Sequence, residues 1–340
     1  MTFENPVYFR IMLIALTVAG VCVIVYGILL WKLRQPLIAR ISRALLAFLA
    51  VLCLALAGYA AWFNNRRPPH PSFKALAPGI DYSRFVGRLA DNAPYVAHLA
   101  SIQTDRRDFR LALAAHPIPG ASVRGLSFTA TLPSQLLRQS GGTLLINGDF
   151  FGPWEDKGPL NYRPHAGQSC ETRGLAVSDG AVINEGKDPY YAHASLWIDN
   201  ERQINTGEWS PLTTGTSNLR MAVSGAGLLV RNSRAQPGRG TPEFGLMRHP
   251  RSVVALSADR KMLYFLVIDG RQPGYSAGMT WAETADFAIA HGADLALMLD
   301  GGGSSTLAAM ENGQPRILNC PIHNTIPGRQ RPIANALVVY

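Results

Sequence analysis

The sequence predicts a mixed α/β (α+β) fold with a mixed β-sheet core and flanking helices, preceded by a two-helix transmembrane hairpin. Two observations predict this: long uncharged segments near the N-terminus, and short apolar runs separated by turn residues along the rest of the chain. About 270 residues follow the apolar segments, enough for one large or two small domains. We therefore expect an anchor at 1–67, a linker at 68–90 and a folded domain at 91–340.

The two N-terminal segments have the length of membrane spans. Ile11–Trp31 holds twenty-one residues without a formal charge and Ala44–Phe63 holds twenty, enough to cross a bilayer as helices. The loop between them carries Lys32, Arg34, Arg40 and Arg43. The positive-inside rule places this loop in the cytoplasm and the domain outside. A cleaved signal peptide is the alternative for the first span, but its apolar run is too long and no small-x-small cleavage site follows.

These spans predict a multi-pass protein of the inner cell membrane with a periplasmic or extracytoplasmic domain. The formal net charge of the chain is +9. Residues 1–67 hold seven basic residues and one acidic residue, so this segment supplies the larger part of that charge. The basic balance therefore does not indicate a nucleic-acid-binding face. The chain also lacks the Gly-Lys-Ser/Thr ending of a nucleotide-binding loop and the Gly-x-Ser-x-Gly elbow of serine hydrolases. We expect neither a nucleic acid nor a nucleotide as partner.

The elements expected after the linker are mostly strands, because their apolar runs are short and bounded by turn residues. The expected strands are 95–102, 109–115, 143–146, 174–178, 181–184, 195–198, 253–257, 262–268, 295–299 and 334–340. Helical spacing predicts two helices, at 132–139 with Ser134 as a possible cap and at 280–291 with Gly292 as its stop. Asp179-Gly180 is a strong hairpin signal between two of the strands.

The most informative run begins where the strand 295–299 ends. It consists of Asp300, Gly301, Gly302, Gly303, Ser304 and Ser305. Glycines allow a tight turn close to a ligand, and successive N–H groups with nearby hydroxyls can form an anion-binding nest. A carboxylate beside such a cradle suits hydrolysis at a bond that carries a phosphate or a developing charge. The alternative is a structural turn that Asp300 caps.

Three other polar segments are also expected as loops that follow strands: Asn147–Phe151, His249–Ser252 and Asp269–Arg271. With Glu283 on the second helix and the closing run from Arg331 to Leu337, this ordered set resembles the phosphodiester glycosidase family. The resemblance extends from about Tyr95 to Tyr340. It departs at Pro250-Arg251-Ser252, where the family usually has Pro-Arg-Thr, and Gly152–Cys170 matches no part of the pattern.

The resemblance implies a hydrolase, a glycosidase that cleaves a sugar-1-phosphodiester or a related glycan linkage of the cell envelope. The family includes bacterial members associated with exopolysaccharide, and a membrane anchor suits that branch. The substrate partner would then be a glycan or a sugar phosphate. The alternative is a non-catalytic glycan-binding or assembly factor in exopolysaccharide biosynthesis or export.

Such chemistry needs a proton donor, stabilisation of an oxocarbenium-like centre and donors for phosphate oxygens. Asp300 and Glu283 are the first candidates for acid–base work, with Asp149 and Asp269 behind them. The expected substrate-binding residues are Asn147, Arg251, Arg271, Gly301, Gly302, Gly303, Ser304, Ser305, Arg331 and Asn335. Arginines can hold phosphate oxygens bidentately, and the asparagines could bind sugar hydroxyls. The alternatives are a solvent-facing Glu283, an Asp269 that only holds the Gly270 turn, and an Arg251 paired with a structural carboxylate.

The sequence indicates no cofactor. Its histidines are too scattered for a zinc pattern, whereas a divalent cation at Asp149, Asp269 or Asp300 stays open. Cys170 and Cys320 are the cysteines of the exported region, where disulfides can form. We expect either a disulfide between them or two free thiols.

Overall fold

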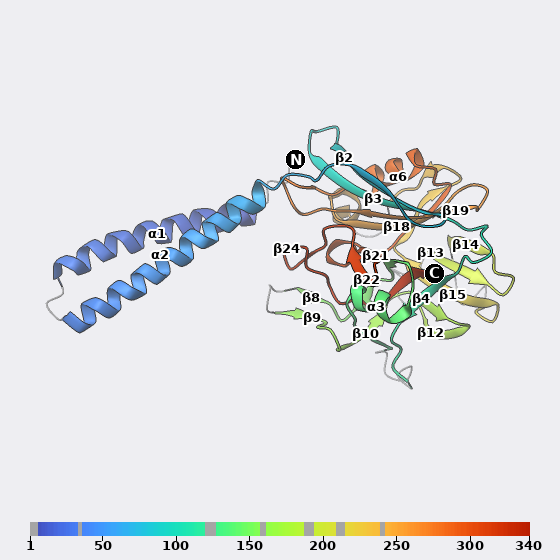
Figure 1. The fold of residues 1–340 in the computed structure, drawn as a ribbon, viewed down its shortest axis with the longest axis horizontal. Coiled ribbons are helices and arrows are strands. Elements are labelled where there is room, and N and C mark those ends of the chain that lie inside the picture. The colour runs from blue at the N-terminus through green and yellow to red at the C-terminus, as the bar shows by residue number, and fades with distance from the viewer. Residues whose placement is uncertain are drawn as a thin grey trace.

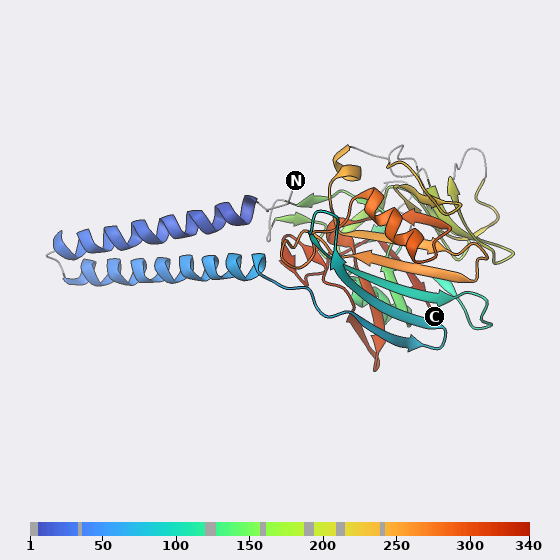
Figure 2. The ribbon, with the colours of Figure 1, turned by 90° about the horizontal axis from the view of Figure 1, so that it is seen from above.

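The computed structural model describes residues 6–32, 36–119, 127–156, 161–186, 194–208, 215–238 and 242–340. Two antiparallel helices, α1 (Pro6–Lys32) and α2 (Pro36–Asn64), project from a β-rich domain (Figures 1 and 2). Within the described residues, one helix, Arg40–Asn64, is long and apolar enough to cross a membrane, and the apolar segment Ile14–Leu29 is shorter. One apolar helix could therefore be a membrane anchor or a signal sequence.

The C-terminal end of α2 packs against the domain. Phe63 is fully buried and contacts Ile322. The Arg66 guanidinium lies 4.5 Å from the centre of the Tyr275 ring and donates to Gln272 Oε1. A Cβ atom at Gly274 would come within 2.4 Å of the Asn64 carbonyl oxygen. The residues that follow α2 are thus held to the domain by packing and hydrogen bonds.

The largest sheet has eight strands in the order β1-β2-β3-β19-β18-β20-β16-β17, all paired antiparallel. Its strands are β1 (Ser72–Ala77), β2 (Ile80–Arg88), β3 (Pro94–Gln103), β16 (Gly227–Arg231), β17 (Arg234–Ala235), β18 (Arg251–Leu256), β19 (Met262–Ile268) and β20 (Leu295–Met298). Helix α6 (Trp281–Ala290) packs on one face through Trp281, Ala285 and Ala288. The segment expected as a linker at 68–90 therefore contains two strands of this sheet.

A second sheet has the order β22-β21-β6-β25-β4 and a third the order β12-β11-β15-β13-β14. The second contains β4 (Leu111–Ala115), β6 (Leu144–Asn147), β21 (Leu307–Glu311), β22 (Gln314–Ile317) and β25 (Asn335–Val339). The third contains β11 (Leu175–Ser178), β12 (Ala181–Glu185), β13 (Ala194–Asp199), β14 (Ile204–Glu208) and β15 (Leu219–Gly225). Helix α3 (Pro133–Ser140) packs beside the second sheet.

Short elements complete the described structure. They are β5 (Phe128–Thr129), β7 (Phe151–Gly152), β8 (Glu155–Asp156), β9 (Tyr162–Arg163), β10 (Ser169–Thr172), α5 (Pro242–Leu246), β23 (Ile322–His323), β24 (Ile326–Pro327) and the 3₁₀ turn Gly302–Ser304. One hydrophobic cluster joins all three large sheets, with Leu145, Leu196 and Phe265 among its fully buried members. The sheets therefore share a core and fix the loops at their ends relative to one another.

The structure confirms the mixed α+β class, but the core is divided among antiparallel sheets in place of one mixed sheet. The expected hairpin at Asp179-Gly180 is present between β11 and β12. The strands predicted at 95–102 and 109–115 exist as β3 and β4, yet they belong to different sheets. Helix α3 begins after Leu132 with Pro133 in its first turn, and Ser134 is not its cap, because proline is well suited to the first helical position.

Candidate active site

A pocket of about 360 Å³ lies where the loops after β6, β19 and β20 meet the segment before β18. We call it the site pocket. Its lining combines four arginines, one carboxylate, one histidine and four aromatic rings. The lining residues are Phe150, Phe151, Trp154, Arg173, Phe244, His249, Pro250, Arg251, Arg271, Asp300, Gly301, Gly302 and Arg331. The structure thus brings Asp300, Arg251, Arg271 and Arg331 together, as the sequence analysis expected of the site.

Asp300 is the carboxylate of the site pocket, and its backbone is fixed on both sides. Its N–H donates to the Gly148 carbonyl oxygen at 3.1 Å, and its own carbonyl oxygen accepts from Asn147 Nδ2 at 2.7 Å. Burial raises the pKa of Asp300 to about 6, although the positive charge of Arg331 and a hydrogen bond with Ser304 lower it. An acid that titrates near neutrality can both donate and accept a proton at physiological pH.

Asp149 is buried, outside the lining of the site pocket. Its Oδ1 accepts from the Ser224 N–H at 2.7 Å, and its Oδ2 accepts from Asn335 Nδ2 at 2.7 Å. Burial, to which the charge of Asp300 adds, raises the pKa of Asp149 to about 8 against these hydrogen bonds. The ionisation of one aspartate therefore depends on the charge of the other.

The two expected sugar-binding asparagines act within the protein. Asn147 Oδ1 accepts from Ser252 Oγ at 2.7 Å and from the Thr306 N–H at 3.1 Å. Asn335 Oδ1 accepts from the Asp149 N–H at 2.9 Å. Neither asparagine lines the site pocket. Their amide groups position the two aspartates.

The glycine-rich loop does not offer the run of free N–H groups that its sequence predicts. The N–H of Gly302 donates to the Pro250 carbonyl oxygen at 2.9 Å, and those of Ser304 and Ser305 donate to the carbonyl oxygens of Gly301 and Gly302. The Gly302 N–H thus joins the loop to the segment before β18, and the two serine N–H groups close the 3₁₀ turn, so these three donors are not available to an anion. The lack of a side chain at Gly303 leaves room for the Arg331 guanidinium, because a Cβ atom there would lie 2.6 Å from Arg331 Nη2.

Arg251 is the most deeply buried cation of the site pocket, with 1% exposure. Its Nε donates to the Met279 carbonyl oxygen at 3.0 Å, and its Nη2 donates to those of Phe244 at 2.6 Å and Met247 at 3.0 Å. Burial lowers the pKa of Arg251 to about 10, and the charge of Arg271 adds to this effect. Backbone oxygens, and not a structural carboxylate, therefore hold its side chain.

One donor of Arg251 has no protein acceptor. Its Nη1 atom is buried and without a hydrogen-bond partner among the residues that the structure describes. A buried N–H of a charged group is costly to leave unpaired. Arg251 lines the site pocket, and an anionic oxygen of a ligand there is the acceptor that we propose for this donor.

Two further arginines of the site pocket are held by side chains. Arg331 Nε donates to His323 Nδ1 at 3.2 Å, and Nη1 donates to Ser304 Oγ at 3.3 Å. Burial and the nearby Arg331 charge lower the pKa of His323 to about 3, so His323 is neutral and can accept. Arg271 Nη2 donates to His249 Nδ1 at 3.3 Å. Three cationic groups are thus oriented around one carboxyl group.

Sequence reasoning missed Arg173 and Trp154, both of which line the site pocket. A Cβ atom at Gly152 would lie 2.4 Å from Arg173 Nη2, and the Arg331 guanidinium lies 5.1 Å from the Trp154 ring centre. Trp154 falls within the segment that matches no family motif. A tryptophan among Pro and Gly residues was the one available signal for a ligand-facing loop.

Glu283 and Asp269 lie outside the lining of the site pocket. Glu283 forms a capping box with Thr280 at the start of α6 and pairs with Arg248 at 2.6 Å. Asp269 accepts from the Cys320 N–H at 2.9 Å and from Asn319 Nδ2 at 3.0 Å, and lies 2.9 Å from His98 Nε2. In the structure, the first carboxylate caps a helix and the second joins β19 to β3 and to the 319–320 loop.

The structure does not contain the expected disulfide. Cys170 is buried in the main hydrophobic cluster, whereas Cys320 Sγ lies near Gln272 and Arg66. These different surroundings keep both thiols free. Among the described residues, no group of three or more His, Cys, Asp or Glu side chains is arranged to hold a metal ion.

The family model for phosphodiester glycosidases matches residues 140–340. The chain belongs to the phosphodiester glycosidase family. No curated protein sequence matches it. Family membership supports a hydrolase of the glycosidase type in general terms.

Two solved structures share the fold of this phosphodiester glycosidase. The catalytic domain of zebrafish N-acetylglucosamine-1-phosphodiester α-N-acetylglucosaminidase, auto-inhibited by its pro-peptide, has 18% identity and a TM-score of 0.58, over 82% of this chain and 92% of that chain. A hypothetical protein from Synechocystis has 14% identity and a TM-score of 0.50, over 80% of this chain and 64% of that chain. At such identities the likeness concerns the fold alone.

Proposed function

We propose that the protein is a membrane-anchored, extracytoplasmic glycosidase that hydrolyses a sugar-1-phosphodiester or a related envelope glycan linkage. The observation that carries the proposal is the site pocket itself, where the Asp300 carboxyl shares one lining with the unpaired Arg251 Nη1 donor and with Arg331. In the reaction, a water oxygen bonds to the anomeric carbon of the sugar, and the bond from that carbon to the phosphate oxygen breaks. The products are a free sugar and a phosphomonoester.

Asp300 is the acid–base residue of this proposal. With a pKa of about 6, it is largely ionised at neutral pH and can take a proton from the attacking water, while its protonated fraction can serve the leaving oxygen. Asp149 also affects the protonation of Asp300, because the pKa of Asp149, about 8, keeps a proton next to Asp300. Asn147 and Asn335 keep the two aspartates in place.

The arginines are the phosphate-binding groups. Arg251 offers one buried donor, and Arg331 is fixed beside Asp300 by Ser304 and His323. Fixed cations stabilise charge that develops on a leaving phosphate without having to reorganise during the reaction. Trp154 and Phe244 present apolar faces in the same pocket, against which a sugar ring can pack.

The proposed anchor consists of α1 and α2, with the cationic loop between them in the cytoplasm. Large side chains of both helices are exposed, including Ile24 at 64% and Val51 at 65%, as a lipid-facing surface requires. A reporter that is active only outside the cytoplasm should be active when fused after Tyr340 and silent when fused between Lys32 and Arg43. The opposite pattern would contradict both the anchor and the compartment.

A non-catalytic role in glycan binding or assembly is the second candidate. The observation that favours it is that Asp300 is the single carboxylate in the lining of the site pocket. The deciding experiment incubates the full chain in detergent with a panel of sugar-1-phosphodiesters and measures the free sugar and the phosphomonoester. Release of both in equal amounts supports the glycosidase, whereas saturable binding without release supports the second candidate.

A further inference from the structure

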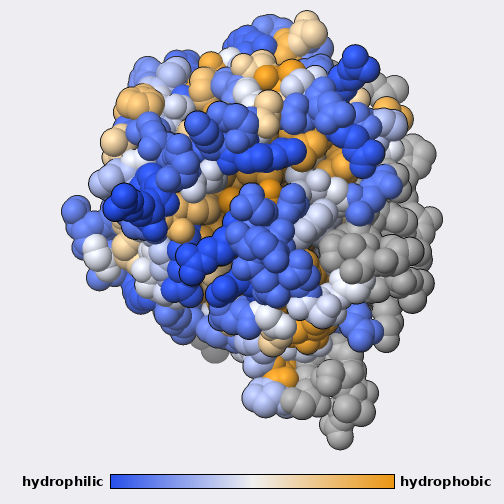
Figure 3. All heavy atoms as spheres, turned by 90° about the vertical axis from the view of Figure 1, so that its right-hand side faces the viewer, coloured by the Kyte–Doolittle hydropathy of each residue, from blue (hydrophilic) through white to orange (hydrophobic). Residues whose placement is uncertain are grey.

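A second pocket, of about 410 Å³, lies at the end of the domain opposite α1 and α2. It forms where the segment before β4, the turn between β13 and β14, and strand β15 come together. We call it the distal pocket and define its rim by Arg107, Arg110, Arg202 and Arg220. Figure 3 looks at this end of the domain and shows a hollow with hydrophobic residues at its floor between strongly hydrophilic side chains.

The positive charge of the distal pocket is not neutralised within the protein. In the part of the chain that the structure describes, the guanidinium groups of Arg107, Arg202 and Arg220 have no hydrogen-bond or ion-pair partner, and that of Arg110 stacks on Tyr340 at 4.5 Å. Of the two carboxylates in the lining, Asp108 pairs with Arg106 at 2.5 Å, and the other belongs to Asp179. Cations that converge in this way repel one another unless an anion joins them.

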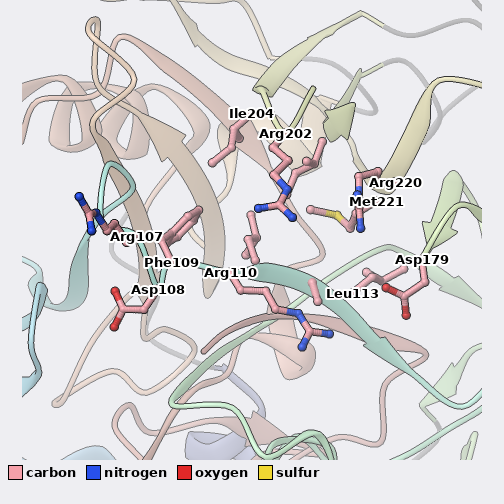
Figure 4. Close-up of a pocket in the computed structure, with 13 residues that line it drawn as sticks. Arg107, Asp108, Phe109, Arg110, Leu113, Asp179, Arg202, Ile204, Arg220 and Met221 are labelled. Carbon is pink, nitrogen blue, oxygen red and sulfur yellow. The ribbon is translucent and has the colours of Figure 1, made fainter. Parts of the chain in front are cut away.

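The backbone around the pocket directs these side chains. Arg202 has a φ angle of +63°, and its turn is closed by two hydrogen bonds: its own N–H donates to the Asp199 carbonyl oxygen at 3.1 Å, and the Gln203 N–H donates to Asp199 Oδ1 at 2.8 Å. Figure 4 shows Arg110, Arg202 and Arg220 around one region, with Arg107 at its margin. The three guanidinium groups come from three separate segments of the chain.

The floor of the distal pocket is apolar. Leu111 and Leu113 from β4 meet Ile198 from β13 and Met221 from β15, and all four side chains are buried. A ligand that packs on the apolar floor and pairs with the arginines of the rim has an apolar face and anionic substituents. A sugar ring with a carboxylate or a phosphate group has this character, because its C–H groups can pack on the floor while guanidinium groups hold the anionic oxygens in pairs.

We propose that the distal pocket binds an anionic saccharide, a sugar residue that carries a carboxylate or a phosphate group. Its volume lies within the range of about 300–1,000 Å³ that is typical of ligand sites. Because it faces away from the proposed anchor, a lipid headgroup of the same membrane is not its ligand. This proposal does not depend on the chemistry assigned to the site pocket.

The test measures binding to the full chain in detergent by calorimetry. One probe is an oligogalacturonate, which carries carboxylates, and another is glucose 6-phosphate, which carries a phosphate; methyl-esterified oligogalacturonate is the neutral control. We expect at least one anionic probe to bind, with an affinity that falls as salt is added. The double variant Arg202→Gln/Arg220→Gln should lower that affinity at least about tenfold, and Arg202→Lys/Arg220→Lys should restore part of it.

Two control variants assign the binding to this pocket. Arg234→Gln removes an exposed cation on β17, and Arg251→Gln removes a cation of the site pocket; neither should change the affinity. The proposal is overturned if neither anionic probe binds, if the neutral ester binds equally well, or if the double glutamine variant binds as the parent does. It is also overturned if Arg251→Gln alone abolishes binding, since the probe then occupies the site pocket.

Discussion

Two of the four arginines in the site pocket are held in the opposite way to the arginines of the distal pocket. In the site pocket, Arg251 is 1% exposed and donates to three backbone oxygens, and Arg331 is 5% exposed and is fixed by Ser304 and His323. In the distal pocket the arginines are exposed, and Arg107, Arg202 and Arg220 have no partner in the described part of the chain. Burying a cation costs desolvation free energy, but a buried, fixed cation can stabilise charge that develops during a reaction without moving. Exposed cations cost little and suit a ligand that arrives already charged.

The carboxylates differ in the same way. Asp149 is buried and Asp300 is half-buried in the wall of the site pocket, and burial raises the pKa of each, whereas Asp108 at the distal pocket is exposed and paired with Arg106. Acidic groups with shifted pKa values are common at sites of proton transfer. This difference supports the proposed division between a catalytic pocket and a binding pocket.

The largest expected effect follows from Asp300→Asn. Asparagine keeps the local hydrogen bonds of a turn but cannot exchange a proton, so kcat on a substrate that the parent cleaves should fall about 10²–10⁴-fold while the melting temperature is kept. Asp294 immediately precedes β20, at the opposite end of the strand from Asp300. Asp294→Asn is therefore the matched control and should leave kcat unchanged. If a folded Asp300→Asn protein keeps near-parental turnover, Asp300 has only a structural role in the turn.

Arg251→Gln should have the next largest effect. Loss of a charged hydrogen bond to the phosphate predicts a decrease in kcat/KM of about 10–100-fold, measured with a thermal melt because Arg251 is buried. Arg251→Lys should recover little of this, since an ammonium group cannot donate to three backbone oxygens and to a ligand at once. Full activity of the lysine variant would argue against a positioned guanidinium.

The buried acid pair also predicts how stability depends on pH. The pKa of Asp149 is raised to about 8 in the folded protein, so the folded state binds a proton more tightly than the unfolded state. The contribution of Asp149 to stability should be fully present below the unfolded pKa near 4 and be lost as the pH rises toward about 8. The melting temperature should fall by several degrees between about pH 5 and pH 8, and Asp149→Asn should flatten this slope. An unchanged slope in the variant would mean that another group causes it.

The smallest effect is expected from the distal pocket. Arg202→Gln/Arg220→Gln should change hydrolysis of a small sugar-1-phosphodiester by less than about twofold, because these side chains lie outside the site pocket. A loss of hydrolysis comparable to that of Arg251→Gln would break the division between the two pockets.

Elements with strong local signals were predictable from the sequence. Strand β19 runs at 262–268 as expected, and α6 begins after Thr280, which caps it. Strands β1 and β2 were not predictable, because they follow a proline-rich segment and are stabilised by pairing with β3, a contact that depends on the fold.

The candidate site was predictable in part for a similar reason. Asp300 and Arg331 lie in loops beside buried strands, and Arg251 is the first residue of β18, where motif order places them together. Whether a side chain reaches the pocket depends on its direction, and for Asp269 that direction is toward His98 and Cys320. The role of Glu283 was available in the sequence, since Thr280-x-x-Glu283 is a capping-box pattern. The distal pocket joins residues from four segments, and no local sequence pattern predicts that they lie together.

The central claim is that the site pocket breaks the bond between the anomeric carbon and the phosphate oxygen. The direct test is hydrolysis of a sugar-1-phosphodiester in water enriched in ¹⁸O, with mass spectrometry of the phosphomonoester product. Water that attacks the anomeric carbon leaves its oxygen on the sugar, so we expect the phosphomonoester to carry no label. An ¹⁸O atom in the phosphomonoester would show attack at phosphorus and would contradict the account.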